Sequence, residues 1–256
     1  LVKYYYQFQR VTRDTLTPYH STMTWTNRLT LFTTLDYVAL GLLIAAWLLI
    51  GWRVESTTSK TPSTARIMSG YRREWMVQMI TRNPRIFDAH VLGSLRQSTA
   101  FFASTSAIAI GGALAMIGNA EHITDIANDL ILVSEPTFVW EAKLLIISLF
   151  LTNAFLKFVW SNRLFGYAAV VMASVPNDPN DPIALPRANQ SAEINITAAR
   201  SFNRGLRAVY FGIAMAAWLL GPVPLMIATA FTLAVIWRRE FASHSRKILM
   251  GTASSE

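Results

Sequence analysis

Two polar side chains interrupt one of the apolar runs of this sequence and could take part in chemistry. Asn153 and Lys157 stand one helical turn apart in LLIISLFLTNAFLKFV, and Trp160 follows three residues after the lysine. Polar and ionisable residues inside a membrane span often line a substrate or ion path, so this pair could line a path for an anion. In the alternative interpretation, the Lys157 ammonium extends to the lipid headgroups and Asn153 bonds a neighbouring helix.

A second group of polar residues occurs in the segment TRNPRIFDAH. Arg82 and Arg85 precede Asp88 and His90 near the start of a predicted helix. These four side chains could form a polar cluster that binds a ligand on the inner side of a membrane. They could equally form a hydrogen-bonded network that fixes the start of the helix, and the sequence leaves both interpretations open.

The rest of the sequence offers little reactive chemistry. It contains no cysteine, which excludes disulfides, thiolate metal sites and cysteine nucleophiles. The four histidines lie in separate segments with no i, i+4 pair, a pattern that does not favour haem or metal ligation. No phosphate-binding glycine loop, Ser-His-Asp set or paired-carboxylate site is recognisable. We therefore expect a protein that is not an enzyme and has no metal and no cofactor.

The charges alternate along the chain as they do in proteins that cross a bilayer repeatedly. The stretches 54–95 and 161–207 are rich in arginine, whereas 119–141 has five carboxylates and no lysine or arginine. This is the pattern that the positive-inside bias produces. The chain is 52% hydrophobic with a net charge of +8, and its basic residues lie beside apolar runs rather than on one basic face. We therefore expect contact with anionic lipid headgroups and not with nucleic acid.

The apolar runs predict a multi-pass bundle of about five membrane segments. These segments are 34–53, 99–118, 140–160, 207–220 and 222–237. Trp140 and Trp160 bracket the third segment, as aromatic residues do at membrane interfaces. The last apolar stretch contains Gly221-Pro222-Val223-Pro224 and is basic at both ends, which predicts a hairpin, spanning or re-entrant, rather than a single crossing. The N-terminus would then lie outside and the C-terminus in the cytoplasm.

Three further segments predict a cytoplasmic layer of helical extensions, so that the fold class is all-α. Residues 66–82 have amphipathic spacing, residues 161–175 continue the third span, and residues 189–206 lead into the fourth. We expect residues 23–247 to form one membrane domain. Residues 1–22 would be a doubtful or mobile extension, and residues 248–256 a flexible tail.

Three charged residues near the ends of the predicted spans have simpler interpretations. Glu141 and Lys143 are expected to mark the outer boundary of the third span. Asp36 stands at the head of the first span, where a carboxylate can cap a helix. None of the three is expected to belong to a site.

Two long stretches carry a family resemblance. They are SGYRREWMVQMITRNPRIFDAHVLGSLRQSTAFFASTSAIAIGGAL and SFNRGLRAVYFGIAMAAWLLGPVPL. In content and order they resemble a family of bacterial membrane proteins with plant relatives, known as domain of unknown function 599. The resemblance covers about residues 34–247, and its most specific parts are Arg-Arg-x-Trp, FFASTS and Trp-Leu-Leu-Gly-Pro. It implies a multi-pass helical membrane protein and no activity, and no functional residue is carried over from it.

Two functions are compatible with these observations. An oligomeric channel or transporter of the bacterial inner membrane is suggested by the small residues of the second span, the broken hairpin and the inner helical layer. A non-catalytic interaction or assembly subunit of a larger membrane complex is suggested by the lack of polar residues deep in the spans. The expected partners are the lipid bilayer and a second copy or another membrane protein.

Overall fold

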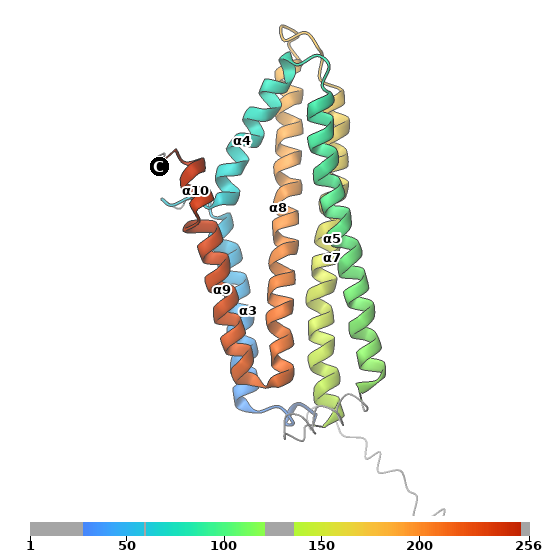
Figure 1. The fold of residues 1–256 in the computed structure, drawn as a ribbon, viewed down its shortest axis with the longest axis vertical. Helices are drawn as coiled ribbons and strands as arrows, with labels where there is room; N and C mark the ends of the chain where they lie inside the picture. The colour runs from blue at the N-terminus through green and yellow to red at the C-terminus, as the bar shows by residue number, and fades with distance from the viewer. Residues whose placement is uncertain (1–27, 59, 121–135, 252–256) are drawn as a thin grey trace, which may run out of the picture. The chain divides into compact units, whose positions relative to one another are not determined.

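The computed structural model describes residues 28–58, 60–120 and 136–251, whose regular structure is all helical. The chain divides into two units, residues 1–33 and 34–256. Within the first unit, residues 28–32 form a short helical turn. The second unit contains every element described below (Figure 1). The predicted extension at 1–22 and the residues 252–256 of the predicted tail lie outside the described residues.

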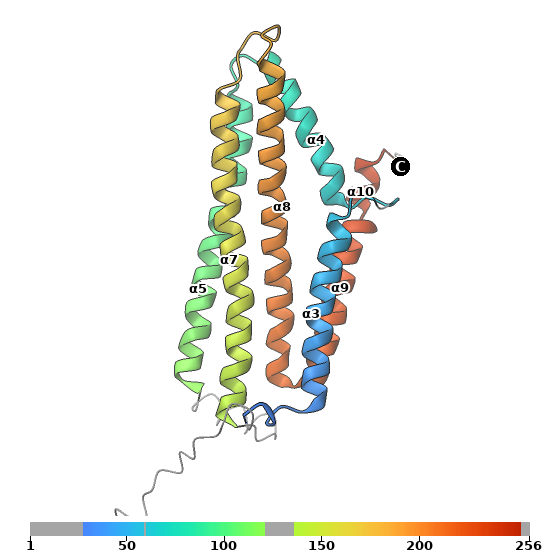
Figure 2. The same ribbon diagram turned by 180° about the vertical axis from the view of Figure 1, so that it is seen from behind.

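Three long helices lie side by side in the second unit. They are α5 (Ile86–Gly118), α7 (Thr137–Ala173) and α8 (Ala184–Ala216). With 33, 37 and 33 residues they are each about 50 Å long or more, well beyond the roughly 30 Å of a bilayer core. Helix α7 packs against α5 on one side and α8 on the other (Figures 1 and 2). The segments 161–175 and 189–206 are therefore continuations of α7 and α8 rather than separate helices.

Two further helices pack together on the other side of α8. Helix α3 (Thr34–Glu55) lies against α9 (Pro222–Phe241), and both contact α8. We call the end of the bundle where α3 begins the Asp36 end, and the level where α3 stops the Glu55 level. Beyond the Glu55 level, the amphipathic helix α4 (Thr64–Gln78) and the turn η1 (Met79–Thr81) pack on α8. The short α10 (His244–Leu249) contacts α4.

The expected hairpin between the last two helices turns at a single glycine. Helix α8 continues as the 3-10 turn η2 (Ala217–Leu220), and α9 begins at once with Pro222. Between them Gly221 has a φ of 116°, a conformation that favours glycine because it has no Cβ. Pro222 and Pro224 fall in the first turn of α9, where a proline costs no helical hydrogen bond.

Beyond the Glu55 level, small side chains let the long helices approach closely. Ala184, Ala188 and Ala192 recur at four-residue spacing on α8 and are completely buried against α7 and α4. The Ser191 hydroxyl donates to the Ala168 carbonyl of α7 at 2.9 Å. Large side chains of α4, η1, α5 and α7 fill the remaining space, among them Met76, Met79, Leu92 and Phe165. The helical layer predicted next to the spans is therefore packed as a core.

Three helices are apolar and long enough to span a membrane within the described residues: α3, α5 and α7. The all-α fold with membrane-compatible helices is thus confirmed. Helix α8 is not among the three because its first half carries polar and charged side chains, and its apolar end is interrupted by η2. The five-segment arrangement stays a prediction.

One tight contact fixes the distance between α7 and α8. A Cβ added at Gly205 would lie 2.7 Å from Cε1 of Phe158. Phe158 is completely buried, and its ring forms a triangle with those of Phe102 and Phe202, with centroid distances of 5.4 Å to Phe102, 5.5 Å to Phe202 and 5.5 Å between the last two. The ring therefore has little room to move.

We expect Gly205→Ala to destabilise the protein by about 1–3 kcal/mol, because the added methyl group overpacks the contact with Phe158. The apparent melting temperature of the purified protein in detergent measures this effect. Gly166→Ala is the matched control, since its Cβ would meet nothing within 4 Å. Equal melting temperatures for the two variants would contradict this account of the packing.

Candidate anion-binding site

An ion-pair network joins the end of α3 to the middle of α8. Glu55, the last residue of α3, accepts hydrogen bonds from Nε of Arg204 at 2.9 and 3.1 Å, and a further one from Nη2 of Arg207. Arg207 is 7% exposed, whereas Arg204 is exposed. The hydrogen bond to Glu55 raises the pKa of Arg204 above its ordinary value. One carboxylate thus faces two guanidinium groups, which leaves a net positive charge at this level.

A cavity of about 690 Å³ opens beside this network, among α3, α7 and α8. We call it the Lys157 cavity. Asn153 and Lys157 of α7 both line it, together with Glu55, Arg204 and Arg207. The sequence-predicted pair therefore lies on the wall of one cavity, in which three cations face a single carboxylate. Such a lining attracts anions.

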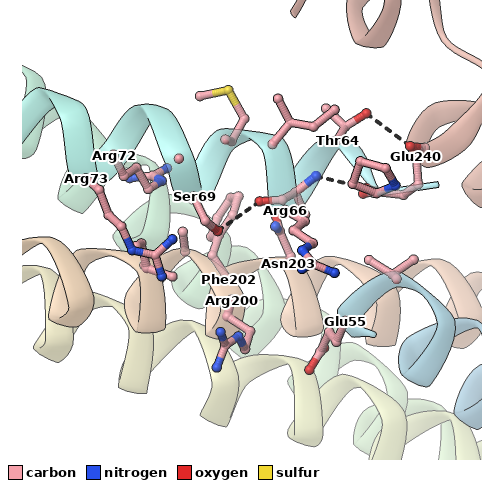
Figure 3. Close-up of a pocket in the computed structure, with 18 of the residues that line it drawn as sticks. Glu55, Thr64, Arg66, Ser69, Arg72, Arg73, Arg200, Phe202, Asn203 and Glu240 are labelled. Carbon is pink, nitrogen blue, oxygen red and sulfur yellow. Dashed lines mark hydrogen bonds between the residues drawn. The ribbon is translucent and has the colours of Figure 1, made fainter. Parts of the chain in front are cut away.

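A second cavity of about 720 Å³ lies on the other side of the network, mainly between α4 and α8. We call it the α4–α8 cavity. Its walls, drawn in Figure 3, carry Arg66, Ser69, Arg72 and Arg73 on α4 and Arg200, Phe202 and Asn203 on α8. Glu55 and Arg207 line both cavities, so the ion pair forms part of the wall between them.

Three of the four residues in the predicted inner polar cluster hold helix ends together. The buried Asp88 carboxylate accepts from Nη1 of Arg82 at 2.5 Å and from Nε1 of Trp75 at 2.7 Å. Arg85 donates to two carbonyl oxygens just after α7, those of Val175 at 2.6 Å and of Pro176 at 2.7 Å.

The fourth residue of that cluster, His90, is exposed on α5. The geometry of the other three is that of a network at the start of α5. Within the part of the chain that the structure describes, no group of three or more histidine, aspartate or glutamate side chains could hold a metal ion.

Two charged side chains, Lys143 and Asp36, are buried at the Asp36 end, which the sequence did not predict. Lys143 is completely buried, with Nζ 5.7 Å from the ring centroid of Trp218 and 6.0 Å from that of Trp140. Lys143 is buried because η2 packs on α7 here, and its ammonium lies near two indole rings. Its place at the outer boundary of the third span stays a prediction. Asp36 is also buried, and its Oδ1 accepts a 2.7 Å hydrogen bond from Nε1 of Trp218.

Two features of the sequence could have pointed to Lys143 and to Glu55. Lys143 follows Trp140 by three positions, so both share a helix face that also carries large apolar side chains. Glu55 is an acidic residue at the basic end of the first span, where the positive-inside pattern makes an unpaired carboxylate unexpected. Neither signal names the partner, because Arg207 is 152 residues away from Glu55.

Over the described residues the chain is all-α, with three helices able to span a membrane and cation-rich cavities where the first of them ends. Residues 38–245 match the family described as protein of unknown function DUF599, and the chain belongs to this family, as the resemblance of its sequence predicted. No curated protein and no solved structure matches the chain.

We expect Trp218→Phe to destabilise the protein by about 1–3 kcal/mol, because a buried carboxylate loses a hydrogen-bond donor while the apolar packing is largely kept. The measurement is again the apparent melting temperature in detergent. Trp52→Phe serves as control, since Trp52 is 70% exposed on α3. If Trp218→Phe melts like the control, the hydrogen bond to Asp36 does not stabilise the Asp36 end.

Proposed function

We propose that this protein is an oligomeric transporter or channel of the bacterial inner membrane that admits a small anion from the cytoplasm through the Lys157 cavity. The observation that carries the proposal is the meeting of Asn153 and Lys157 with Arg204 and Arg207 on one cavity. Four hydrogen-bond donors, three of them cationic, offer an anion a substitute for the water it leaves.

The depth of the cavity supports a role in permeation. On α3 its lining begins at Trp47, eight residues before Glu55, which corresponds to about 12 Å of helix. Trp47 and Asn153 both belong to helices that are apolar enough to span a membrane. An anion in this cavity would thus already have passed the headgroup level.

Between the Lys157 cavity and the Asp36 end the side chains are closely packed, which supports a conformation that is closed at that end. Trp47 packs on Phe150 with ring centroids 5.2 Å apart. Leu43, Phe211 and Met215 are completely buried next along the bundle. Passage of an anion would therefore require this packing to open, as in transporters in which helix hairpins move.

The topology proposed with this function has the Glu55 level on the cytoplasmic side and five membrane segments. Both arms of the α8–α9 hairpin are basic at that level, and Arg239 near the end of α9 donates to the Tyr210 hydroxyl of α8. A hairpin brings both basic flanks to the same side, as the positive-inside rule requires.

The absence of native cysteine allows a direct test of topology. Single variants Lys60→Cys, Asp129→Cys and Ser254→Cys would be exposed to a membrane-impermeant maleimide in intact cells. We expect Asp129→Cys to react at once, and the other two to react only after the cells are lysed, because the basic segments stay in the cytoplasm. Labelling of Ser254→Cys in intact cells would contradict the hairpin.

For transport, we expect proteoliposomes containing the full chain to carry a flux of chloride or phosphate. Lys157→Gln should reduce that flux about tenfold, the effect of roughly 1.4 kcal/mol of lost electrostatic stabilisation. Arg238→Gln, an exposed arginine that lines neither cavity, should keep it. Absence of flux for every anion under any gradient would contradict the proposal.

A non-catalytic assembly subunit is the second candidate, and the surface of α5 favours it. This helix packs chiefly against α7, and its apolar side chains face outward, with Phe101 65% and Ile108 76% exposed. Such a face suits a second copy or another membrane helix as well as lipid. Purification in a mild detergent separates the two functions, since an assembly subunit would co-purify with a partner. We propose no catalytic role.

A further inference from the structure

The α4–α8 cavity has more positive charge than the protein itself neutralises. Five arginines and two glutamates line it. Both carboxylates are already engaged. Glu55 binds Arg204 and Arg207, and Oε2 of Glu240 accepts the backbone N–H of Ala65 at the start of α4, at 3.2 Å. The backbone N–H does not neutralise Glu240, so the two carboxylates balance two of the five guanidinium charges in the lining and leave three.

Three of the lining arginines make no ion pair within the described residues. Arg66 donates to backbone carbonyl oxygens, that of Ser56 at 3.1 Å and that of Thr57. Arg72 donates to the side-chain oxygen of Asn195. Arg200 is exposed and has no hydrogen-bond or ion-pair partner in the described part of the chain.

Arg72 of α4 reaches α8, where it donates to the neutral side chain of Asn195 and not to a carboxylate. Burial lowers the pKa of Arg72 below its ordinary value, since it disfavours the charged form. An arginine remains protonated under such conditions. A guanidinium of this kind, partly buried with only an amide as partner, is a ready ligand for an anion. Arg73 differs, because its Nε pairs with Glu193 at 2.6 Å.

The cavity also has an apolar part and lies at a particular level. Leu95 of α5, Phe165 of α7 and Phe202 of α8 line one side of it. Val54 and Glu55, at the end of the membrane-compatible helix α3, line it as well. Cationic and apolar walls therefore meet where the proposed span reaches the headgroup region, an arrangement that suits an amphiphile with an anionic head.

We propose that the α4–α8 cavity binds the phosphate group of an anionic phospholipid. Arg66, Arg72 and Arg200 would supply the charge, because guanidinium groups bind phosphate oxygens in a bidentate manner. The Asn203 amide on the α8 wall (Figure 3) would add a neutral hydrogen bond. The Ser69 hydroxyl on the α4 wall donates to the Ala65 carbonyl at 3.1 Å and would have to turn to reach the phosphate. This site is separate from the Lys157 cavity and does not depend on transport.

Native mass spectrometry of the full chain in a neutral detergent tests the proposal. The probes are dioleoyl phosphatidylglycerol, dioleoyl phosphatidylcholine and inorganic phosphate. The main variant is Arg200→Gln, which removes no side-chain hydrogen bond or ion pair within the described structure, so that we expect it to fold. Arg66→Gln is the second variant. Arg96→Gln, an exposed arginine on α5 that does not line the cavity, is the control.

We expect phosphatidylglycerol to bind more tightly than phosphatidylcholine, and Arg200→Gln and Arg66→Gln each to weaken its binding about tenfold. Arg96→Gln should have no effect. Failure of inorganic phosphate to displace the lipid would identify the lipid as the source of the phosphate group. Displacement by inorganic phosphate at equal concentration would overturn the lipid assignment, and equal binding of both lipids to all variants would overturn the site.

Discussion

The ion pairs of the Glu55 carboxylate with Arg204 and Arg207 are the interaction on which the arrangement of side chains at the Glu55 level depends. It joins the last residue of α3 to α8 and stands between the two cation-rich cavities. Without it the buried guanidinium of Arg207 would lose its carboxylate partner, and an unpaired buried charge is strongly destabilising. The ion pair holds the end of α3 against α8. Of the arginines of α8, Arg204 lines the Lys157 cavity, Arg200 lines the α4–α8 cavity, and Arg207 lines both.

The packing of the other helices determines where the ion pairs of Glu55 lie. Close packing of α7 on α8, enforced where Gly205 meets Phe158, sets the relative height of Lys157 and Arg204. The tight turn at Gly221 returns α9 alongside α3, so that the basic end of α9 lies at the Glu55 level. If the apolar helices lie in a bilayer, as proposed, the cost of placing cations in its hydrocarbon core accounts for the charges at this level. Among the described residues Lys143 lies toward the other end of α7, where it is completely buried beside Trp218.

The elements of the fold were largely predictable from the sequence, because hydropathy and charge alternation act over short stretches. The apolar cores of α3, α5 and α7 fall where the first three spans were expected, and the helical spacing of Asn153 and Lys157 brings both to one cavity. The contacts between distant segments were not predictable. Glu55 meets Arg207 across 152 residues and Asp36 meets Trp218 across 182, and no periodicity encodes such pairings. His90 shows the converse: it lies two residues after the buried Asp88 in the sequence, yet it is exposed on α5.

A double-mutant cycle on Glu55→Gln and Arg207→Gln, read as apparent unfolding free energies in detergent, measures whether this ion pair organises the Glu55 level. If the ion pair organises the Glu55 level, each single variant loses stability and the two changes are strongly non-additive, with a coupling of about 1–3 kcal/mol. Additive effects, with a coupling near zero, would contradict it: Glu55 and Arg207 would then act independently, and neither cavity would depend on their pairing.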